Sequence, residues 1–400
     1  MKDLKDTCRV AVVQCAPVMF DKKAGTEKMV ELIREAGKNG AELIVFPELI
    51  IPCYPYGMTF GYTVGSRDKV GRLDWKRYYD NSLCVPGPET ELLGQAAKEV
   101  HAYVSIGVSE RGEDSATLYN SNIVFSPEGE LLNVHRKLKP TGAERLVYGD
   151  ANKDYFPITE TPWGPMGNLI CWESYMPLAR VALYQKGITL YISPNTNDNP
   201  EWQDTIKHIA IEGHCFFINA DMVFTKEMYP KDLHCPQEIE QLSDIPCRGG
   251  SCVVDPYGHY VTQPVWDKED IIYADLDMQQ AIASRMEFDG VGHYARPDVL
   301  ERWYEAADPE FLAFADNYAS AKNDTNLAQM VRRLYDYSTS YPWPEEWLEQ
   351  ITGIYEPQAL TEETLADPKS WLQELMRYLH AVIGGIAWNH CDQPDGIHAV

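Results

Sequence analysis

The feature that most constrains the fold of this chain is a regular alternation of short apolar runs and amphipathic stretches between Arg9 and Asp277. Two stretches, Lys28–Ala36 and Glu89–His101, carry apolar residues at helical spacing. The apolar runs of strand length are Val10–Gln14, Leu43–Phe46, Tyr103–Val108, Leu118–Phe125, Leu131–His135, Asn168–Cys171, Leu190–Ser193, Phe216–Ala220, Ser251–Val254 and Ile271–Asp275. Strands that alternate with helices, together with some hairpins, predict an α/β fold with a mixed sheet or two sheets.

The charge of the chain narrows the choice of partners. Its 400 residues include 35 basic and 60 acidic side chains, which give a formal net charge of −25. A field of that sign repels nucleic acid and anionic lipid, whereas a neutral small molecule is indifferent to it. No apolar run approaches the roughly 20 residues that a membrane span needs. We therefore expect a small-molecule substrate, no nucleic acid and no membrane.

The cysteines indicate the compartment and the absence of a metal site. The ten cysteines are scattered and form no CxxC pair, so we expect neither a structural zinc site nor a disulfide framework. The segment Met1–Thr7 is charged and runs straight into an apolar run, which does not resemble a secretory signal. The cytoplasm is the expected location, with most of the thiols serving as small core residues.

The character of the chain changes near residue 300. The region beyond it is rich in acidic residues and holds five of the ten tryptophans. Two stretches, Leu327–Tyr337 and Ser370–Ile383, have a helical pattern. We predict one domain over residues 1–305. Residues 306–400 then form an acidic, aromatic-rich and mostly helical extension, which packs on this domain or on a neighbouring subunit.

Three places in the sequence carry residues suited to chemistry. Glu48 directly follows an apolar strand, where α/β folds place their sites, and partial burial would make it a general base. Cys171 ends another strand, and the N–H groups and helix N-terminus that follow would favour a thiolate. Lys137 stands in a cluster of cations with Glu144 seven residues beyond, and a fixed lysine can stabilise a developing anion. Taken singly, each residue also fits a structural role.

In the order Glu48, Lys137, Glu144, Cys171, these residues resemble the catalytic set of the nitrilase superfamily. Longer motifs resemble its nitrilase branch in particular, over roughly residues 8 to 300. They are Tyr119-Asn120-Ser121-Asn122, the run from His135 to Arg145, Cys171-Trp172-Glu173-Ser174-Tyr175-Met176-Pro177-Leu178, His208–Gly213, Arg248-Gly249-Gly250-Ser251 and Phe288–Asp298.

The resemblance implies a four-layer α-β-β-α sandwich and a nitrilase that needs no cofactor. Cys171 would attack the nitrile carbon to give a thioimidate, with Glu48 as general base. Lys137, with the main-chain N–H of Trp172, would stabilise the developing charge, and Glu144 would orient the lysine. Water would then release ammonia, and a second water would release the acid from a thioester.

The same resemblance suggests the substrate pocket and the assembly. The residues expected to bind substrate are Tyr54, Trp172, Asn195, Thr196 and Trp202, although Trp202 is equally suited to capping its helix. The form of the Cys171 motif favours aliphatic nitriles or dinitriles. Members of this family form dimers and spiral oligomers, so we expect a homo-oligomer.

Three alternatives stay open at this point. The nearest is an amidase or carbamoyl hydrolase with the same four residues. A non-catalytic assembly protein that keeps the fold is an alternative of another class. A papain-like cysteine hydrolase would use a histidine base, and no pattern assigns that role to one of the ten histidines.

Overall fold

The computed structural model describes residues 3–152, 155–197 and 199–296. The predicted boundary at residue 305 and the predicted extension over 306–400 lie outside the described residues. The strands are β1 (Thr7–Gln14), β2 (Leu43–Val45), β3 (Tyr62–Thr63), β4 (Ser66–Arg67), β5 (Tyr103–Arg111), β6 (Leu118–Phe125), β7 (Leu131–Arg136), β8 (Ile158–Thr161), β9 (Gly164–Asn168), β10 (Leu190–Asn195), β11 (Phe216–Asp221), β12 (Val223–Phe224), β13 (Cys247–Val254), β14 (Tyr260–Trp266) and β15 (Asp270–Asp277). The α-helices are α1 (Lys22–Lys38), α2 (Gly71–Asp80), α3 (Pro88–Val100), α4 (Pro177–Gln185), α5 (Trp202–Gly213), α6 (Pro236–Glu240) and α7 (Gln280–Ala283). Short 3₁₀ turns span Gly142–Leu146, Cys171–Tyr175, Lys226–Met228 and Ser284–Met286.

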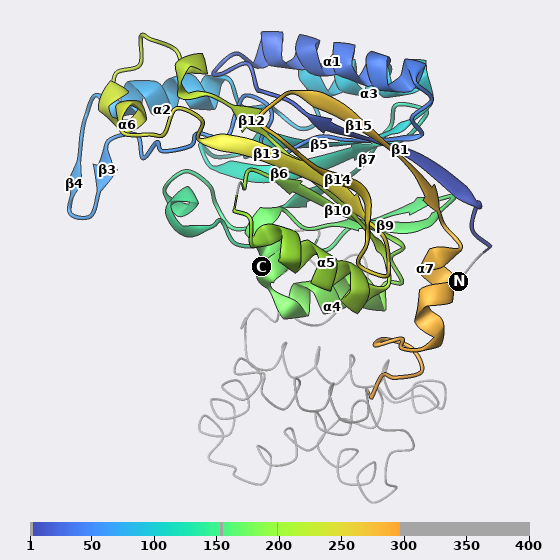
Figure 1. The fold of residues 1–400 in the computed structure, drawn as a ribbon. Coiled ribbons are helices and arrows are strands. Elements are labelled where there is room, and N and C mark those ends of the chain that lie inside the picture. The colour runs from blue at the N-terminus through green and yellow to red at the C-terminus, as the bar shows by residue number, and fades with distance from the viewer. Residues whose placement is uncertain (1–2, 153–154, 198, 297–400) are drawn as a thin grey trace, which may run out of the picture. The chain divides into compact units, whose positions relative to one another are not determined.

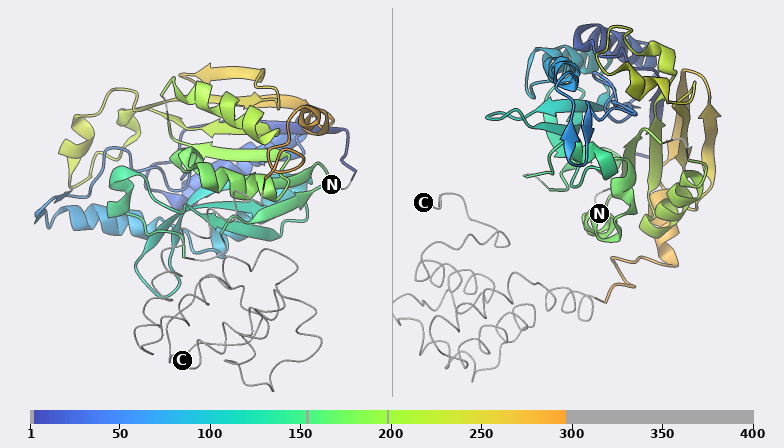
Figure 2. Two further views of the ribbon diagram at one scale, coloured as in Figure 1. Left: turned by 90° about the horizontal axis from the view of Figure 1, so that it is seen from below. Right: turned by 90° about the vertical axis from the view of Figure 1, so that its left-hand side faces the viewer.

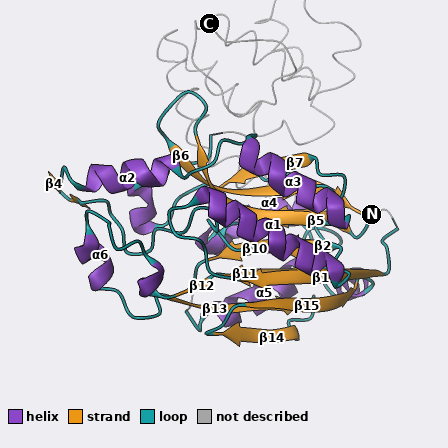
Figure 3. Cartoon of the chain, turned by 90° about the horizontal axis from the view of Figure 1, so that it is seen from above, coloured by secondary structure: helices purple, strands orange, loops and turns teal. Residues whose placement is uncertain are grey.

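Two sheets are built from these strands. The first has the order β15-β1-β2-β5-β6-β7, and β1, β2 and β5 run parallel. The second has the order β12-β13-β11-β10-β9-β8, with β14 paired to β13. Its centre, β9, β10 and β11, is also parallel. Figure 1 shows α1 and α3 on the outer face of the first sheet and α4 and α5 on the outer face of the second. Seen from above, α1 and α3 lie side by side (Figure 3).

The alternation of side chains along the strands produces the layers. In β1, Val10 and Val12 belong to the core between the two sheets, whereas Ala11 and Val13 face the core under α1 and α3. In β11, Phe216 likewise faces the core between the sheets, and Phe217 faces the core under α4 and α5. Both sheets are therefore covered on both faces, which confirms the predicted four-layer α-β-β-α sandwich (Figure 2).

The observed bounds of several helices and strands differ from the predicted ones. Helix α1 starts six residues before the predicted Lys28, because Asp21 caps it by accepting a hydrogen bond from Ala24 N–H at 3.0 Å. The strand predicted over Asn168–Cys171 already ends at Asn168, and Cys171 opens a 3₁₀ turn. The helix expected to follow Cys171 begins only at Pro177.

Helices α2 and α6 and the β3–β4 hairpin project beyond one end of the two sheets (Figure 1). Buried carboxylates hold these elements. Asp74 of α2 accepts hydrogen bonds from the main-chain N–H groups of His234 and Cys235 at 2.9–3.0 Å. Glu238 of α6 accepts four hydrogen bonds from residues 59–61 at 2.7–3.1 Å. The sequence pattern did not predict these elements, since tertiary contacts hold them in place.

Within the described ranges, none of the helices has the length and apolar character to cross a membrane. The same residues contain no group of three or more His, Cys, Asp or Glu side chains that could hold a metal ion.

Candidate active site

Glu48 is placed by an irregular segment that follows β2. Its side chain is fully buried. The main chain before and after Glu48 is hydrogen-bonded to Gly107 of β5. Gly107 N–H donates to Pro47 O at 3.2 Å, and Gly107 O accepts from Ile50 N–H at 2.9 Å. A Cβ at Gly107 would stand 2.7 Å from Glu48 Cα, so only glycine lets the two segments approach this closely. The next residue, Leu49, has φ +48°, a left-handed conformation that few side chains adopt.

Lys137 lies directly after β7 and joins the two glutamates. Its main-chain N–H donates to Asn120 O on β6 at 2.8 Å. Its buried Nζ donates to Glu48 Oε1 at 2.8 Å and to Glu144 Oε1 and Oε2 at 3.1 and 3.0 Å. The predicted base, cation and second carboxylate therefore form one hydrogen-bonded row.

Glu144 is held from two further sides. It lies in the 3₁₀ turn Gly142–Leu146, where its Oε2 accepts from Thr141 N–H at 2.9 Å. Tyr54 Oη donates to Glu144 Oε1 at 2.7 Å. Burial, followed by the charges of Glu144 and Glu48, raises the pKa of Tyr54 well above its ordinary value, so the hydroxyl keeps its proton and remains a donor.

Cys171 approaches this row from the second sheet. It follows β9 and opens the turn Cys171–Tyr175 with φ +54°, and its side chain is 5% exposed. A strained residue at a strand-to-turn junction is typical of nucleophiles. The charges that act on its thiol come from Glu48, Lys137 and Glu144, and the main-chain N–H of Thr196 hydrogen-bonds to it. Cys171 and Glu48 thus come from different sheets.

The electrostatics of the site differ from the sequence expectation in one respect. Burial and then the charge of Glu48 raise the pKa of the Cys171 thiol well above its ordinary value, although Lys137 acts in the opposite direction. The expected α-helix N-terminus is absent here, since α4 begins only at Pro177. The thiol therefore rests protonated and must pass its proton to a base before it can attack.

The base and the cation are suited to that proton transfer. Burial raises the pKa of Glu48 above its ordinary value, and Lys137 only partly opposes the shift. Burial works to lower the pKa of Lys137, but its acidic neighbours, Glu48 first among them, outweigh burial and raise that pKa, so the ammonium persists. A buried thiol beside a proton acceptor and a permanent cation can carry out nucleophilic addition to a polar multiple bond.

Two of the five predicted substrate-binding residues flank Cys171 in sequence or space. Trp172 is 46% exposed, and its ring packs edge-on against Tyr175 at 5.6 Å between centroids. Thr196 is buried, and its Oγ1 has no hydrogen-bond partner within the described part of the chain. With Tyr54 bonded to Glu144, these residues adjoin Cys171 or the row of three that it approaches.

The other two lie further into the second sheet and its outer layer. Asn195 is fully buried, and its Nδ2 donates to Asn219 Oδ1 at 2.8 Å. Trp202 is fully buried at the start of α5, and its Nε1 donates to the same oxygen at 2.9 Å. Its ring packs against Phe217 and Tyr175, so the structure gives Trp202 a position in the core under α4 and α5.

Sequence reasoning missed three buried polar residues beside the site, although all three stand inside the motifs quoted above. Asn120 donates to Glu48 Oε1 at 2.6 Å. Glu173 accepts from Ile170 N–H at 2.7 Å, from Leu138 N–H at 2.8 Å and shares a 2.8 Å contact with His135 Nε2. For His135 and Glu173 the available signal was their adjacency in sequence to Lys137 and Cys171, whereas Asn120 had only its place in the motif that starts at Tyr119.

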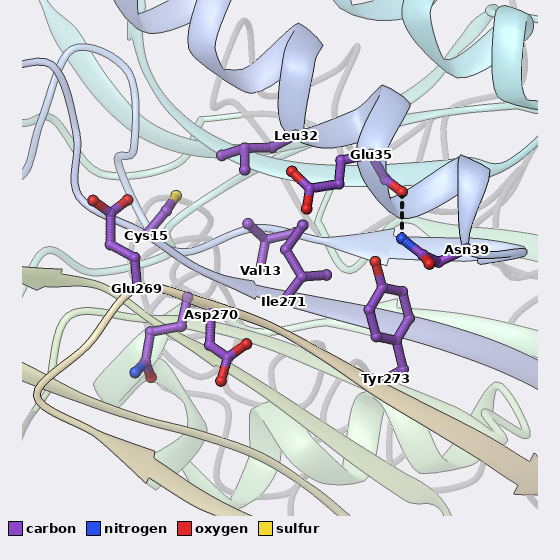
Figure 4. Close-up of a pocket in the computed structure, with 10 residues that line it drawn as sticks. Val13, Cys15, Leu32, Glu35, Asn39, Glu269, Asp270, Ile271 and Tyr273 are labelled. Carbon is purple, nitrogen blue, oxygen red and sulfur yellow. Dashed lines mark hydrogen bonds between the residues drawn. The ribbon is translucent and has the colours of Figure 1, made fainter.

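A separate surface groove has no part in this site. It has a volume of about 400 Å³ between α1 and β15. Figure 4 shows its lining, which includes the carboxylates Glu35, Glu269 and Asp270 and none of the nine predicted site residues. Glu269 is already paired with Lys28 Nζ at 2.7 Å.

Comparison with known proteins agrees with this geometry. A sequence model of the carbon-nitrogen hydrolase family matches residues 9–286. The chain belongs to the carbon-nitrogen hydrolase family. Within the nitrilase superfamily it falls in the nitrilase branch, as the motifs indicated. A papain-like cysteine hydrolase with a histidine base is thereby set aside, and the charged groups around Cys171 are carboxylates and a lysine.

Its relatives cover most of the chain. An aliphatic nitrilase of Sinorhizobium fredii (strain HH103) is 45% identical over 297 residues, 73% of this chain and 94% of that protein. Nitrilase 2 of Arabidopsis thaliana is 38% identical over 325 residues, 80% of this chain and 94% of that protein. Among solved structures, Saccharomyces cerevisiae Nit3, a member of branch 10 of the nitrilase superfamily, matches with a TM-score of 0.58 and 21% identity over 74% of this chain and 99% of that one. This last likeness concerns the fold alone.

Proposed function

We propose that the chain hydrolyses aliphatic nitriles to carboxylic acids and ammonia, with Cys171 as nucleophile, Glu48 as general base and Lys137 as the stabilising cation. The observation that carries this proposal is the buried row in which Lys137 Nζ lies 2.8 Å from Glu48 and 3.0 Å from Glu144, with its charge acting on the Cys171 thiol. Similarity to an aliphatic nitrilase supports the substrate class.

The first half of the reaction uses all four residues. Glu48 takes the proton of the Cys171 thiol while the sulfur attacks the nitrile carbon. The S–C bond forms as a π pair moves to nitrogen, and nitrogen takes up a proton to give a thioimidate. Lys137 and the main-chain N–H of Trp172 stabilise the charge that develops on nitrogen, and Glu144 orients the lysine.

The second half uses two waters. Glu48 activates the first water, which adds to the thioimidate, and the tetrahedral adduct expels ammonia to leave a thioester. The second water then releases the carboxylic acid and restores the thiol. The chain needs no cofactor for these steps, because the substrate and water supply every atom exchanged.

The pocket follows from the positions of the predicted binding residues. Trp172 and Thr196 adjoin the nucleophile, Tyr54 adjoins Glu144, and the Oδ1 atom of Asn195 is buried without a partner among the described residues. Trp202 acts indirectly, since Tyr175 contacts its ring at 5.4 Å and that of Trp172 at 5.6 Å. We therefore assign Trp202 to support of the pocket wall.

Assembly and location belong to the same proposal. The layer formed by α4 and α5 exposes Leu178 and Ile211, which are 61% and 48% accessible, next to the partly exposed Met176 that precedes α4. A second copy of this chain is the occupant that would bury this surface in a homo-oligomer. The nine cysteines in the described ranges form no disulfide with one another, which suits the reducing cytoplasm.

The two competing functions differ in what they predict. An amidase or carbamoyl hydrolase would use the same four residues on an amide, and a non-catalytic assembly protein would not need them. The nitrilase relatives favour nitrile over amide as substrate. A complete hydrogen-bonded row of base, cation and second carboxylate favours an enzyme over a scaffold.

Ammonia release from aliphatic nitriles, dinitriles, aromatic nitriles and the matching amides tests this proposal. Cys171→Ala is expected to abolish turnover, whereas Cys215→Ala removes a fully buried thiol from the core under α4 and α5 and should leave turnover unchanged. Carboxylic acid as the main product from aliphatic nitriles is the expected result. Turnover of amides alone would assign an amidase, and no Cys171-dependent turnover of any substrate would favour the assembly protein.

A further inference from the structure

Asn120 touches the proposed base, although no role has been assigned to it so far. It lies on β6 and is buried. Its Nδ2 donates to Glu48 Oε1 at 2.6 Å, and Lys137 Nζ donates to the same oxygen at 2.8 Å. The other oxygen, Glu48 Oε2, is buried and has no hydrogen-bond partner among the described residues. The two carboxylate oxygens are therefore not equivalent.

This asymmetry has a direct chemical consequence. An oxygen that already accepts two hydrogen bonds, one of them from an ammonium, is a poor proton acceptor. An oxygen without a donor keeps its lone pairs available in a region of low dielectric, where they are most basic. A proton that arrives at Glu48 thus finds only one suitable oxygen.

We propose that Asn120 is a positioning residue that, together with Lys137, engages Oε1 of Glu48 and so presents Oε2 as the oxygen that takes the proton of Cys171. This inference deepens the proposed function and rests on Glu48 being the general base. The Asn120 amide cannot turn around, because its Oδ1 would then face a carboxylate oxygen at hydrogen-bond distance.

The backbone of Asn120 contributes as well. Its carbonyl oxygen accepts a hydrogen bond from Lys137 N–H at 2.8 Å. Asn120 therefore holds the side chain of Glu48 through its amide and the main chain of Lys137 through its carbonyl. Asn120 is also a neutral donor. A neutral donor steadies the ionised carboxylate without adding a second cation, which would weaken Glu48 as a base.

The proton and electron pairs balance in this arrangement. The S–H bond of Cys171 breaks and an O–H bond forms at Oε2. The sulfur pair forms the C–S bond while a π pair of the nitrile moves to nitrogen, and nitrogen then takes the proton from Oε2. The thioimidate forms and Glu48 returns to its carboxylate state, ready for the water step.

The hydrogen bond from Asn120 also acts on the acidity of the base. Burial raises the pKa of Glu48, and this hydrogen bond is one of the interactions that oppose the rise. Without the donor, the pKa of Glu48 moves further up. Since the base must be deprotonated, the acid limb of the pH profile then moves to higher pH.

A matched pair of variants on β6 tests the inference. Asn120→Leu keeps the side-chain volume and removes the donor. Asn122→Leu makes the same change two residues along, on the same face of the strand, where the buried Asn122 exchanges hydrogen bonds with Ser105 at 2.9 and 3.3 Å. The acid limb of kcat/KM for the best nitrile and the pH dependence of Cys171 alkylation by iodoacetamide are measured in each variant.

The expected result is an acid limb about one to two pH units higher in Asn120→Leu, with kcat/KM at pH 7 about 10- to 100-fold lower and partly regained at alkaline pH. Asn122→Leu should lower the melting temperature and leave the limb in place. Asn120→Ala supplies the same readout if Asn120→Leu does not fold.

Two outcomes would overturn the inference. One is that the acid limb of the kcat/KM profile lies at the same pH in both Asn120 variants as in the unaltered chain. The other is that Asn122→Leu moves this limb to higher pH by as much as Asn120→Leu does. Failure of the proposed function is a separate result, because it requires that the unaltered chain show no Cys171-dependent release of ammonia from nitriles.

Discussion

At the scale of single residues, burial and neighbouring charges decide whether the Cys171 thiol and the Lys137 amine keep their protons. The Cys171 thiol keeps its proton because burial and Glu48 raise its pKa, and Lys137 keeps its own because the surrounding negative charges outweigh burial. The site therefore rests with a protonated thiol and an ammonium. Charge separation is deferred until the sulfur attacks, when Lys137 is already in place to stabilise it.

The pH dependence of the enzyme follows from these shifts. Glu48 must be ionised to take a proton, and its pKa lies above the ordinary glutamate value of 4.5. As pH falls through that raised pKa, kcat/KM should fall, so the acid limb is expected above pH 4.5. Lys137 should cause no loss below about pH 10, because its pKa is raised from 10.5. Measuring kcat/KM from pH 4 to pH 10 decides this, and a limb at or below the ordinary value contradicts the burial argument.

A single glycine should decide whether Glu48 reaches its place. In Gly107→Ala the new Cβ would meet Pro47 O at 2.4 Å and Glu48 Cα at 2.7 Å, and backbone atoms cannot give way cheaply. A displacement of about 1 Å at the base should lower kcat/KM by about 100-fold. In Gly25→Ala on α1 the nearest atoms are 3.9 Å away, so activity should be retained. Equal activity in the two variants would show that the segment around Glu48 adapts.

At the scale of elements, Glu173 connects the turn of the nucleophile to the strand of the cation. Its two oxygens accept from Ile170 N–H, directly before Cys171, and from Leu138 N–H, directly after Lys137. His135 of β7 adds a third contact. The turn from one sheet is thus held against a strand of the other sheet by one buried carboxylate.

Removing this charge should loosen the site and lower stability. In Glu173→Gln the amide keeps one acceptor oxygen, so one of the two main-chain N–H groups faces an NH2 group and loses its acceptor. We expect the unfolding free energy to fall by about 1–3 kcal/mol and kcat/KM to fall by about 10- to 100-fold. Denaturant melts and kinetics measure both. Asp74→Asn is the control, because Asp74 also accepts from main-chain N–H groups but binds α2 to His234 and Cys235. Comparable losses of kcat/KM in the two variants would show that Glu173 stabilises the fold in general and has no particular effect on the site.

At the scale of the whole molecule, the four layers bring the site together. The first sheet supplies Glu48 after β2, Asn120 within β6 and Lys137 after β7, and the second supplies Cys171 and Thr196 after β9 and β10. The core between the sheets therefore sets how the nucleophile meets its base. This explains why no single motif could contain the site.

The outer layer of α4 and α5 should determine assembly. Replacing Leu178, which is 61% exposed on α4, by Asp places a charge on the surface that we assign to a second copy, so Leu178→Asp should shift the protein towards smaller species. Light scattering after size-exclusion chromatography measures this. Leu92→Asp makes the same change at a 54% exposed leucine of α3 and should leave the mass unchanged. If both variants keep the native mass, the contact surface lies elsewhere.

The sequence by itself determined the fold class and the residues that we propose as the reacting groups. Alternation of apolar runs with helical stretches predicted most strands to within a few residues, because side-chain periodicity is a local property. It was less accurate at Asn168–Cys171, where the strand ends early, and it missed α2 and α6, which rest on the buried carboxylates Asp74 and Glu238. Motif order was sufficient to name Glu48, Lys137, Glu144 and Cys171 and the family to which the chain belongs.

Only the tertiary structure decided the state of those residues. Burial raised the pKa of the Cys171 thiol where the sequence suggested a thiolate, and the packing of α5 placed Trp202 in the core under α4 and α5. The fold also left one oxygen of Glu48 free by placing Asn120 and Lys137 on the other. Desolvation and hydrogen-bond geometry depend on which segments meet in space, and here residues 48, 120, 137 and 171 meet only because two sheets pack face to face.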